Sequence, residues 1–253
     1  MVLVHGSLVG APHATWRSVR MLADRYELRS VVREGYAGQI RSLRRRTAAL
    51  DIARVVEALR PSAHLVGFSS GGTIALATAS SYPEAVRSLT VIEPLAFSCA
   101  RGEPAVEEII RRLVPLFERV DGLPPEAFWE EFVHVSGLTI PIPPSLTPEH
   151  YRSVQAMMRE PPPWRIPISE RVLRAASFPK MVVAGGERPF SWIDAAIREA
   201  APKVARLIEA RFEVFREAGH GVHLIGNRFN RRLESIWEEG EAAMTRRTED
   251  RWW

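Results

Sequence analysis

Short apolar runs alternate along the chain with longer stretches in which apolar residues recur at helical spacing. The short runs occupy residues 2–4, 28–32, 63–68, 88–92, 181–184 and 212–215, and we expect each to be a β-strand. The longer stretches occupy residues 16–25, 47–59, 72–81, 192–200 and 230–244, and we expect each to be a helix. This alternation predicts an α/β fold, in which helices flank a mostly parallel sheet of about six strands.

The alternation breaks between residues 96 and 176. Helical segments are expected near residues 106–120 and 125–132, and two proline-rich passages, PIPP and PPPW, begin at residues 141 and 161. Prolines at this density cannot pair in a central sheet. We therefore expect a helical cap of residues 96–176, inserted between the fourth and fifth strands of a core domain made of residues 1–95 and 177–253.

Size and composition are those of a globular protein. The 253 residues are 46% hydrophobic and 25% charged, which argues against disorder and suffices for one sizeable core. The single cysteine, Cys99, rules out a disulfide within the chain. The N-terminus lacks the basic region of a signal peptide, and no stretch approaches the ~20 apolar residues of a membrane span. We therefore expect a cytoplasmic protein that has no membrane partner.

The formal net charge of +4 raises the question of a nucleic-acid partner. The excess is mostly arginine, and arginines are spread along the chain, often beside glutamates, as is typical of solvated helix faces. The one dense run, residues 41–46, has no interleaved aromatic residues. We expect no nucleic-acid partner, and the sequence leaves the oligomeric state open, a homodimer included.

Residues 67–72 read GFSSGG and connect an expected strand to an expected helix. A serine at such a sharp turn projects its hydroxyl clear of the backbone, and flanking glycines let neighbouring elements pass close by. The N-terminus of the helix also directs free amides at charge that develops on a substrate. The pattern predicts that Ser69 is a nucleophile. A glycine-rich turn without catalytic function is the alternative, and it leaves Ser69 unexplained.

Three segments, in this order, resemble the α/β-hydrolase superfamily: the strand that ends in His5-Gly6, the elbow at residues 67–71, and AGH at residues 218–220. The resemblance covers nearly the whole chain. It is greatest to small bacterial serine hydrolases in which the strand after the elbow ends in Ile-Glu-Pro, here residues 92–94, and a helical cap follows. The resemblance implies the α/β-hydrolase fold.

The same resemblance implies how the site works. The backbone amides of Ser7 and Ser70 would form the oxyanion hole, and His220 would be the general base. His223 competes for that role, but it falls at the start of the following segment, where a packing role is expected. The two histidines also have a spacing that suits metal ligands, yet no third ligand cluster accompanies them. We therefore expect neither a metal nor a cofactor.

The acid of the triad departs from the commonest pattern of the superfamily. Arg188 stands where an aspartate usually follows the fifth strand, and an arginine cannot accept a hydrogen bond from an imidazole. Glu93 is our first choice, because the carboxyl ends of parallel strands converge on the active site and haloalkane dehalogenases with a glutamate there resemble this arrangement. Glu187 comes second and Asp194 third. An ion pair between Glu93 and a cap arginine is the non-catalytic alternative.

The expected activity is that of a carboxylesterase-like serine hydrolase. The expected cap is rich in large apolar side chains, which favours a small-molecule substrate with an apolar acyl or aromatic group. These side chains are Phe97, Phe117, Phe128, Trp129, Phe132, Met157, Met158 and Trp164. Thioester, lactone or carbon–carbon bond hydrolysis would use the same residues. Outside hydrolysis, the alternatives are a lyase or cyclase on this scaffold and a binding protein that has lost its acid.

Overall fold

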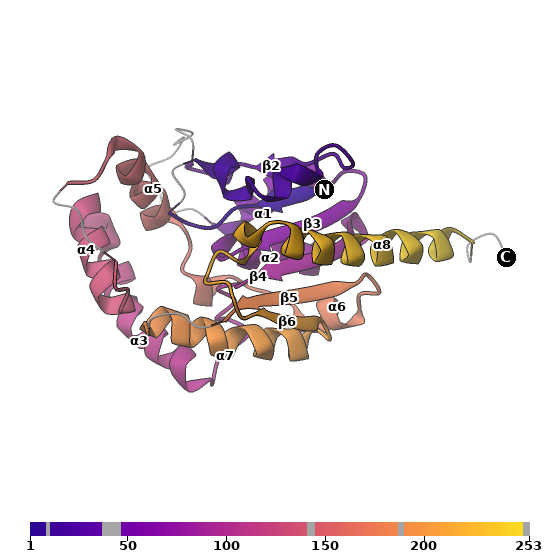
Figure 1. The fold of residues 1–253 in the computed structure, drawn as a ribbon. Helices are drawn as coiled ribbons and strands as arrows, with labels where there is room; N and C mark the ends of the chain where they lie inside the picture. Colours follow the sequence, from indigo (N-terminus) through magenta and orange to yellow (C-terminus); the bar gives the residue numbers. More distant parts are fainter. Residues whose placement is uncertain (9–10, 37–46, 141–144, 187–189, 250–253) are drawn as a thin grey trace.

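A computed structural model describes residues 1–8, 11–36, 47–140, 145–186 and 190–249 (Figure 1). Ser69, Glu93 and His220 all lie within these ranges. Two features singled out in the sequence, the arginine-rich run at residues 41–46 and the loop residues Glu187 and Arg188, lie outside them.

The strands form a single sheet in the order β2-β1-β3-β4-β5-β6, and each pair of neighbours is parallel. They are β1 (Val2–Val4), β2 (Arg29–Val31), β3 (Ala63–Phe68), β4 (Val86–Ile92), β5 (Lys180–Gly185) and β6 (Arg211–Phe215). Each lies where an apolar run predicts it. The α/β fold class with a parallel six-stranded sheet is confirmed.

Helices cover both faces of this sheet, because successive side chains of each strand point to opposite faces. On one face, Val182 of β5 packs with residues of α1 (Ala48–Leu59), α2 (Ser70–Ser81) and α7 (Trp192–Leu207). On the other, Val183 packs with residues of α8 (Asn227–Glu249) and of two 3₁₀ helices, Pro12–Trp16 and Val19–Leu22. No helix in the described ranges is long and apolar enough to cross a membrane.

Two expected helices differ from the observed elements. Residues 16–25 do not form one α-helix: Trp16 ends the first 3₁₀ helix, residues 19–22 form the second, and the other residues are turns. The buried residues Trp16, Val19 and Leu22 are three apart. That spacing places them on one side of a helix with three residues per turn. The helix expected at residues 192–200 continues to Leu207 despite Pro202, because Val204 and Ala205 beyond the proline are buried in the core.

The segment between β4 and β5 is helical, as its sequence predicts. It contains α3 (Pro104–Glu118), α4 (Pro125–Ser136), α5 (Pro148–Arg159) and α6 (Glu170–Ala175). We call residues 96–176 the insertion. Its helices α3, α4 and α5 stand to one side of the sheet, at the left in Figure 1, and share an apolar cluster with α7, whereas α6 packs against α2. The division of the chain into a core and a cap stays a prediction.

Candidate active site

Ser69 occupies a sharp turn between β3 and α2. Its φ of 56° and ψ of −125° are unusual for a residue with a side chain and are typical of a nucleophile elbow. The glycines around it are required by close packing. A Cβ atom on Gly71 would lie 2.2 Å from the carbonyl oxygen of His5, and one on Gly67 would lie 2.5 Å from the carbonyl oxygen of Gly71. The amide of Ser69 donates to the carbonyl of Ile92 at 2.9 Å, which joins the elbow to the end of β4.

Glu93 follows β4 directly and contacts His220 across 127 residues of sequence. Its Oε2 lies 2.8 Å from Nδ1 of His220, and its Oε1 accepts a hydrogen bond from the amide of Gly185 at 2.6 Å. The side chain is fully buried, and the backbone has a positive φ of 48°. Because a carboxylate accepts hydrogen bonds, Nδ1 of His220 donates to it, and Nε2 is left free to accept a proton.

The other candidates for the base and the acid, His223 and Asp194, make different contacts. His223 is buried between the rings of Trp16 and Phe68, and burial lowers the pKa of His223 to about 4. Asp194 accepts a hydrogen bond from the hydroxyl of Ser191 at 2.7 Å, at the start of α7. Glu187 is outside the described residues. The geometry thus favours Glu93 over Asp194 as the partner of His220.

Ser69 and His220 line the same cavity, which has a volume of about 460 Å³. This size lies within the range of sites that hold small organic molecules. Much of its wall is apolar and comes from the insertion, including Leu113, Phe117, Phe132, Leu138 and Met157. Ser7 and Ser70, the two residues whose amides are expected to form the oxyanion hole, line it as well.

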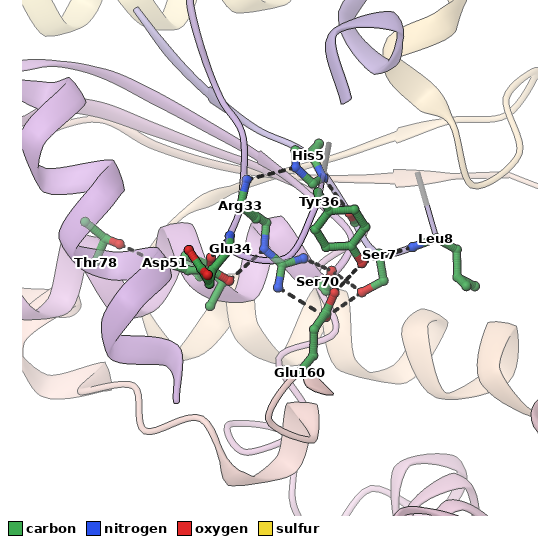
Figure 2. A network of polar contacts seen from close by, with 12 residues as sticks. His5, Ser7, Leu8, Arg33, Glu34, Tyr36, Asp51, Ser70, Thr78 and Glu160 are labelled. Atoms are coloured by element: carbon green, nitrogen blue, oxygen red, sulfur yellow. Dashed lines mark hydrogen bonds and ion pairs between the residues drawn. The ribbon is translucent and has the colours of Figure 1, made fainter. Parts of the chain in front are cut away.

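A buried polar network borders the cavity beside Ser7 and Ser70 (Figure 2). Its two principal members, Arg33 and Glu160, both line the cavity, and neither is predicted by the sequence. Arg33 follows β2, whereas Glu160 caps the C-terminal end of α5 in the insertion. Nothing local marks an isolated arginine or glutamate as buried, so only the folded arrangement reveals them.

His5 holds the loop that carries Ser7. Its Nε2 accepts a hydrogen bond from the amide of Arg33 at 3.1 Å, so the other ring nitrogen, Nδ1, carries the proton and donates to the carbonyl of Gly6 at 2.7 Å. Burial, together with the charge of Arg33, lowers the pKa of His5 to about 3. A neutral His5 therefore shapes the loop and does not act as an acid or a base at neutral pH.

Cys99, in the insertion, is not an activated nucleophile. Burial raises the pKa of the Cys99 thiol to about 12, so the thiolate is scarce at neutral pH. Among the described residues, no group of three or more histidine, cysteine or carboxylate side chains is placed to hold a metal ion.

Comparison with known proteins agrees with this geometry. A model of the "Alpha/beta hydrolase family" matches residues 1–229. The chain belongs to the alpha/beta hydrolase family. A search of curated protein sequences gives no match for this alpha/beta hydrolase.

Several solved structures resemble this alpha/beta hydrolase in fold. The meta-cleavage product hydrolase from Pseudomonas fluorescens is 21% identical with a TM-score of 0.61, over 94% of this chain and 90% of that one. MenH from S. aureus is 19% identical with a TM-score of 0.66, and the match covers 95% of this chain and 93% of that one. The carboxylesterase CesB from Bacillus subtilis is 20% identical with a TM-score of 0.56, and the match covers 93% of this chain and 82% of that one. At these identities the likeness shows the fold alone.

Proposed function

We propose that this alpha/beta hydrolase is a serine hydrolase that cleaves carboxylic esters or related acyl substrates with an apolar acyl or aromatic group. The strongest support is the 2.8 Å contact between His220 and the buried Glu93, beside a cavity that Ser69 also lines. A serine in a strained elbow and an imidazole oriented by a carboxylate are the parts that acyl transfer requires. The apolar walls of the cavity support the choice of substrate.

In the proposed first half-reaction, Oγ of Ser69 attacks the carbonyl carbon while Nε2 of His220 takes the hydroxyl proton. Glu93 accepts a hydrogen bond from Nδ1 of His220 and stabilises the imidazolium that forms. The carbonyl oxygen becomes an oxyanion, which the amides of Ser7 and Ser70 bind. The bond to the leaving alcohol then breaks, the alcohol takes the proton from Nε2, and the acyl group stays on Ser69.

In the second half-reaction, water replaces the alcohol. His220 takes a proton from the water as its oxygen attacks the acyl carbon, and the same two amides bind the second oxyanion. The bond to Oγ of Ser69 breaks, Oγ recovers the proton from His220, and the carboxylic acid leaves.

A fluorophosphonate probe tests the proposal. The probe is expected to label the wild-type protein and to leave Ser69→Ala unlabelled, since it reacts with an activated serine hydroxyl. The wild-type protein should also hydrolyse nitrophenyl esters, whereas Ser69→Ala should lose at least about 10³-fold in kcat. A folded wild-type protein that neither reacts with the probe nor hydrolyses any ester in a panel of rising chain length would contradict the proposal. Such a result would favour a lyase, a cyclase or a binding protein.

Hydrolysis of a carbon–carbon bond is a second candidate, because one structural neighbour is a meta-cleavage product hydrolase. The same serine, histidine and acid would serve that reaction. The two candidates are separated by comparing kcat/KM for nitrophenyl esters with kcat/KM for a meta-cleavage product. A clear preference for the second substrate would replace ester hydrolysis as the proposed activity. Thioesters and lactones belong in the same panel.

A further inference from the structure

A chain of hydrogen bonds joins Arg33 to Glu160 through the hydroxyls of Ser70 and Ser7 (Figure 2). Nη1 of Arg33 lies 2.8 Å from Oγ of Ser70, the two serine Oγ atoms are 2.7 Å apart, and Oγ of Ser7 lies 2.6 Å from Oε2 of Glu160. A guanidinium can only donate and an ionised carboxylate can only accept. Ser70 therefore accepts from Arg33 and donates to Ser7, and Ser7 donates to Glu160. The direction of each hydrogen bond is fixed by the two charged ends.

The charged ends of this chain are buried and paired. The side chains of Arg33 and Glu160 are 1% and 9% exposed, and Nη2 of Arg33 lies 3.1 Å from Oε2 of Glu160. Nε of Arg33 also lies 3.0 Å from Oδ2 of the buried Asp51. Burial tends to lower the pKa of Arg33, but the charges of Glu160 and Asp51 outweigh it and raise the pKa above its usual value. The guanidinium is therefore charged in the folded protein.

Tyr36 completes the set of donors to Glu160. Its hydroxyl donates to Oε1 of Glu160 and accepts a hydrogen bond from the amide of Leu8 at 3.3 Å. Burial and the negative charge of Glu160 raise the pKa of Tyr36 well above its usual value, so the phenol stays protonated. Both oxygens of Glu160 are thus held in place, and the loop that contains Ser7 is attached to Glu160 through Tyr36 as well.

The members of this chain come from four separate parts of the fold. Ser7 follows β1, Arg33 follows β2, Ser70 is the first residue of α2, and Glu160 belongs to the insertion. Ser7 and Ser70 are 63 residues apart in sequence, and their amides are the two oxyanion donors of the proposed mechanism. The insertion therefore supplies a hydrogen-bond partner, Glu160, to the side chain of one of these two residues, Ser7.

We propose that Arg33 and Glu160 are positioning residues, which fix the spacing of the Ser7 and Ser70 amides through the ordered pair of serine hydroxyls. This inference rests on the proposed function, because it concerns the two amides that bind the oxyanion in the proposed mechanism. An oxyanion exists in the transition state and not in the ground state, so amides that are misplaced lower kcat and leave KM nearly unchanged. Since Glu160 lies in the insertion, the oxyanion hole is complete only when the insertion is seated on the core.

Two variants test the proposal with a nitrophenyl ester as the substrate. Ser7→Ala keeps the backbone amide and removes the hydroxyl link, and Glu160→Gln keeps the size of the side chain and removes the carboxylate. Each is expected to lower kcat by about 10- to 100-fold, less than the complete loss of an oxyanion donor, with KM within about threefold of wild type. The double variant should be little worse than Glu160→Gln alone, because both changes interrupt the same chain.

Glu103→Gln is the matched control. Glu103 lies in the insertion and pairs with Lys203 of α7 at 2.9 Å, away from the cavity, so its loss should leave kcat and KM unchanged. The melting temperature of each variant is measured alongside, and Ser7→Ala is expected to fold even if Glu160→Gln does not.

A folded Ser7→Ala protein with the kcat of wild type would overturn the proposal. So would a double variant whose fold-loss in kcat equals the product of the losses in the two single variants. A lower melting temperature in Glu160→Gln without a change in kcat would show that the network only stabilises the fold. Failure of the proposed function is a separate result, because it would appear as a wild-type protein that no fluorophosphonate labels.

Discussion

The carboxyl edge of the sheet and the insertion that faces it across the cavity are built in different ways. At the edge, main-chain hydrogen bonds, glycines without room for a Cβ and two positive φ values place Ser69 and Glu93. In the insertion, large side chains pack on one another, as where the rings of Phe128 and Phe132 stack with centroids 6.1 Å apart. The edge therefore fixes the positions of the proposed catalytic residues, whereas the insertion sets the shape and polarity of the cavity around them.

This difference predicts which substitutions each region tolerates. A change at the edge that keeps the size of a side chain but alters its hydrogen bonding should lower kcat strongly and leave the fold intact. A change of size in the insertion wall should alter which substrates bind and should lower stability, because the wall is also a hydrophobic core. Glu160 is the exception, since it is a polar residue of the insertion that reaches the edge.

Among the substitutions that test this comparison of the two regions, Glu93→Gln is expected to have the largest effect. A glutamine amide cannot accept hydrogen bonds at both of its polar atoms, yet both oxygens of Glu93 accept one, from His220 and from the amide of Gly185. His220 would lose its orientation and the stabilisation of its charged form, so kcat should fall by about 10²- to 10⁴-fold. Steady-state kinetics on a nitrophenyl ester measure this loss, and circular dichroism checks that the fold persists.

The two other candidate acids provide the comparison for that variant. Asp194→Asn is expected to keep most of the activity, because the structure pairs Asp194 with Ser191 at the start of α7. Glu187→Gln is expected to do the same. If the loss follows one of these variants and Glu93→Gln remains active, that carboxylate replaces Glu93 in the triad.

The sequence predicts the edge well because its signals are local. A strand, a glycine-flanked serine and a helix follow one another within residues 63–81, and a glutamate that ends a strand must lie at the carboxyl edge of a parallel sheet. Glu93 and His220 are distant in sequence, but Glu93 directly follows one predicted strand and His220 lies in the loop after another. The topology of the sheet then brings them together.

The insertion and the polar network are predicted less well because their contacts are not local. Helix α5 is not among the helices that the sequence predicts, although Thr147 and Pro148 form a helix start in which the Thr147 hydroxyl accepts a hydrogen bond from the amide of His150. Proline-rich passages lie on either side of this signal and obscure it, because prolines at that density are typical of irregular connections. Arg33 and Glu160 carry no such signal. Their burial depends on meeting each other across the cavity, which no window of sequence contains.

A smaller effect is expected from Phe132→Ala in the insertion wall. Phe132 is 4% exposed and lines the cavity, so its removal enlarges the space available to an acyl chain. The free energy of unfolding should fall by about 3–5 kcal/mol, as for other buried phenylalanines. In a panel of nitrophenyl esters, the chain length with the highest kcat/KM should increase, while kcat for the acetyl ester stays within about threefold of wild type.

Phe128→Ala separates the two roles of that wall. Phe128 belongs to the same helix and is fully buried, but it does not line the cavity that the described residues form. The Phe128→Ala substitution should lower the free energy of unfolding by a similar amount and should leave the preferred acyl chain length unchanged. A preference that shifts equally in both variants would mean that the insertion adjusts as a whole, and the assignment of Phe132 as a specificity residue would then be wrong.

The smallest effect concerns the pH dependence of stability, which we expect to arise in the core and not in the insertion. His64 of β3 is buried, with Nδ1 2.9 Å from Oγ of Ser88 and Nε2 2.9 Å from Oε1 of Glu241, which also pairs with Arg87. Burial lowers the pKa of His64 to about 4, although Glu241 opposes this. The unfolded chain takes up a proton at His64 below about pH 6.5, whereas the folded chain does so only near pH 4.

The free energy of unfolding should therefore fall as the pH is lowered through that interval, and His64 should account for up to about 3 kcal/mol of the fall. Urea unfolding of His64→Gln at pH 7 and pH 4.5 should show a smaller difference between the two pH values than wild type does. His134→Gln is the control, because His134 is exposed on α4 in the insertion and should leave the difference unchanged. If His134→Gln reduces the pH dependence and His64→Gln does not, proton uptake is coupled to the seating of the insertion, and the two regions do not respond to pH separately.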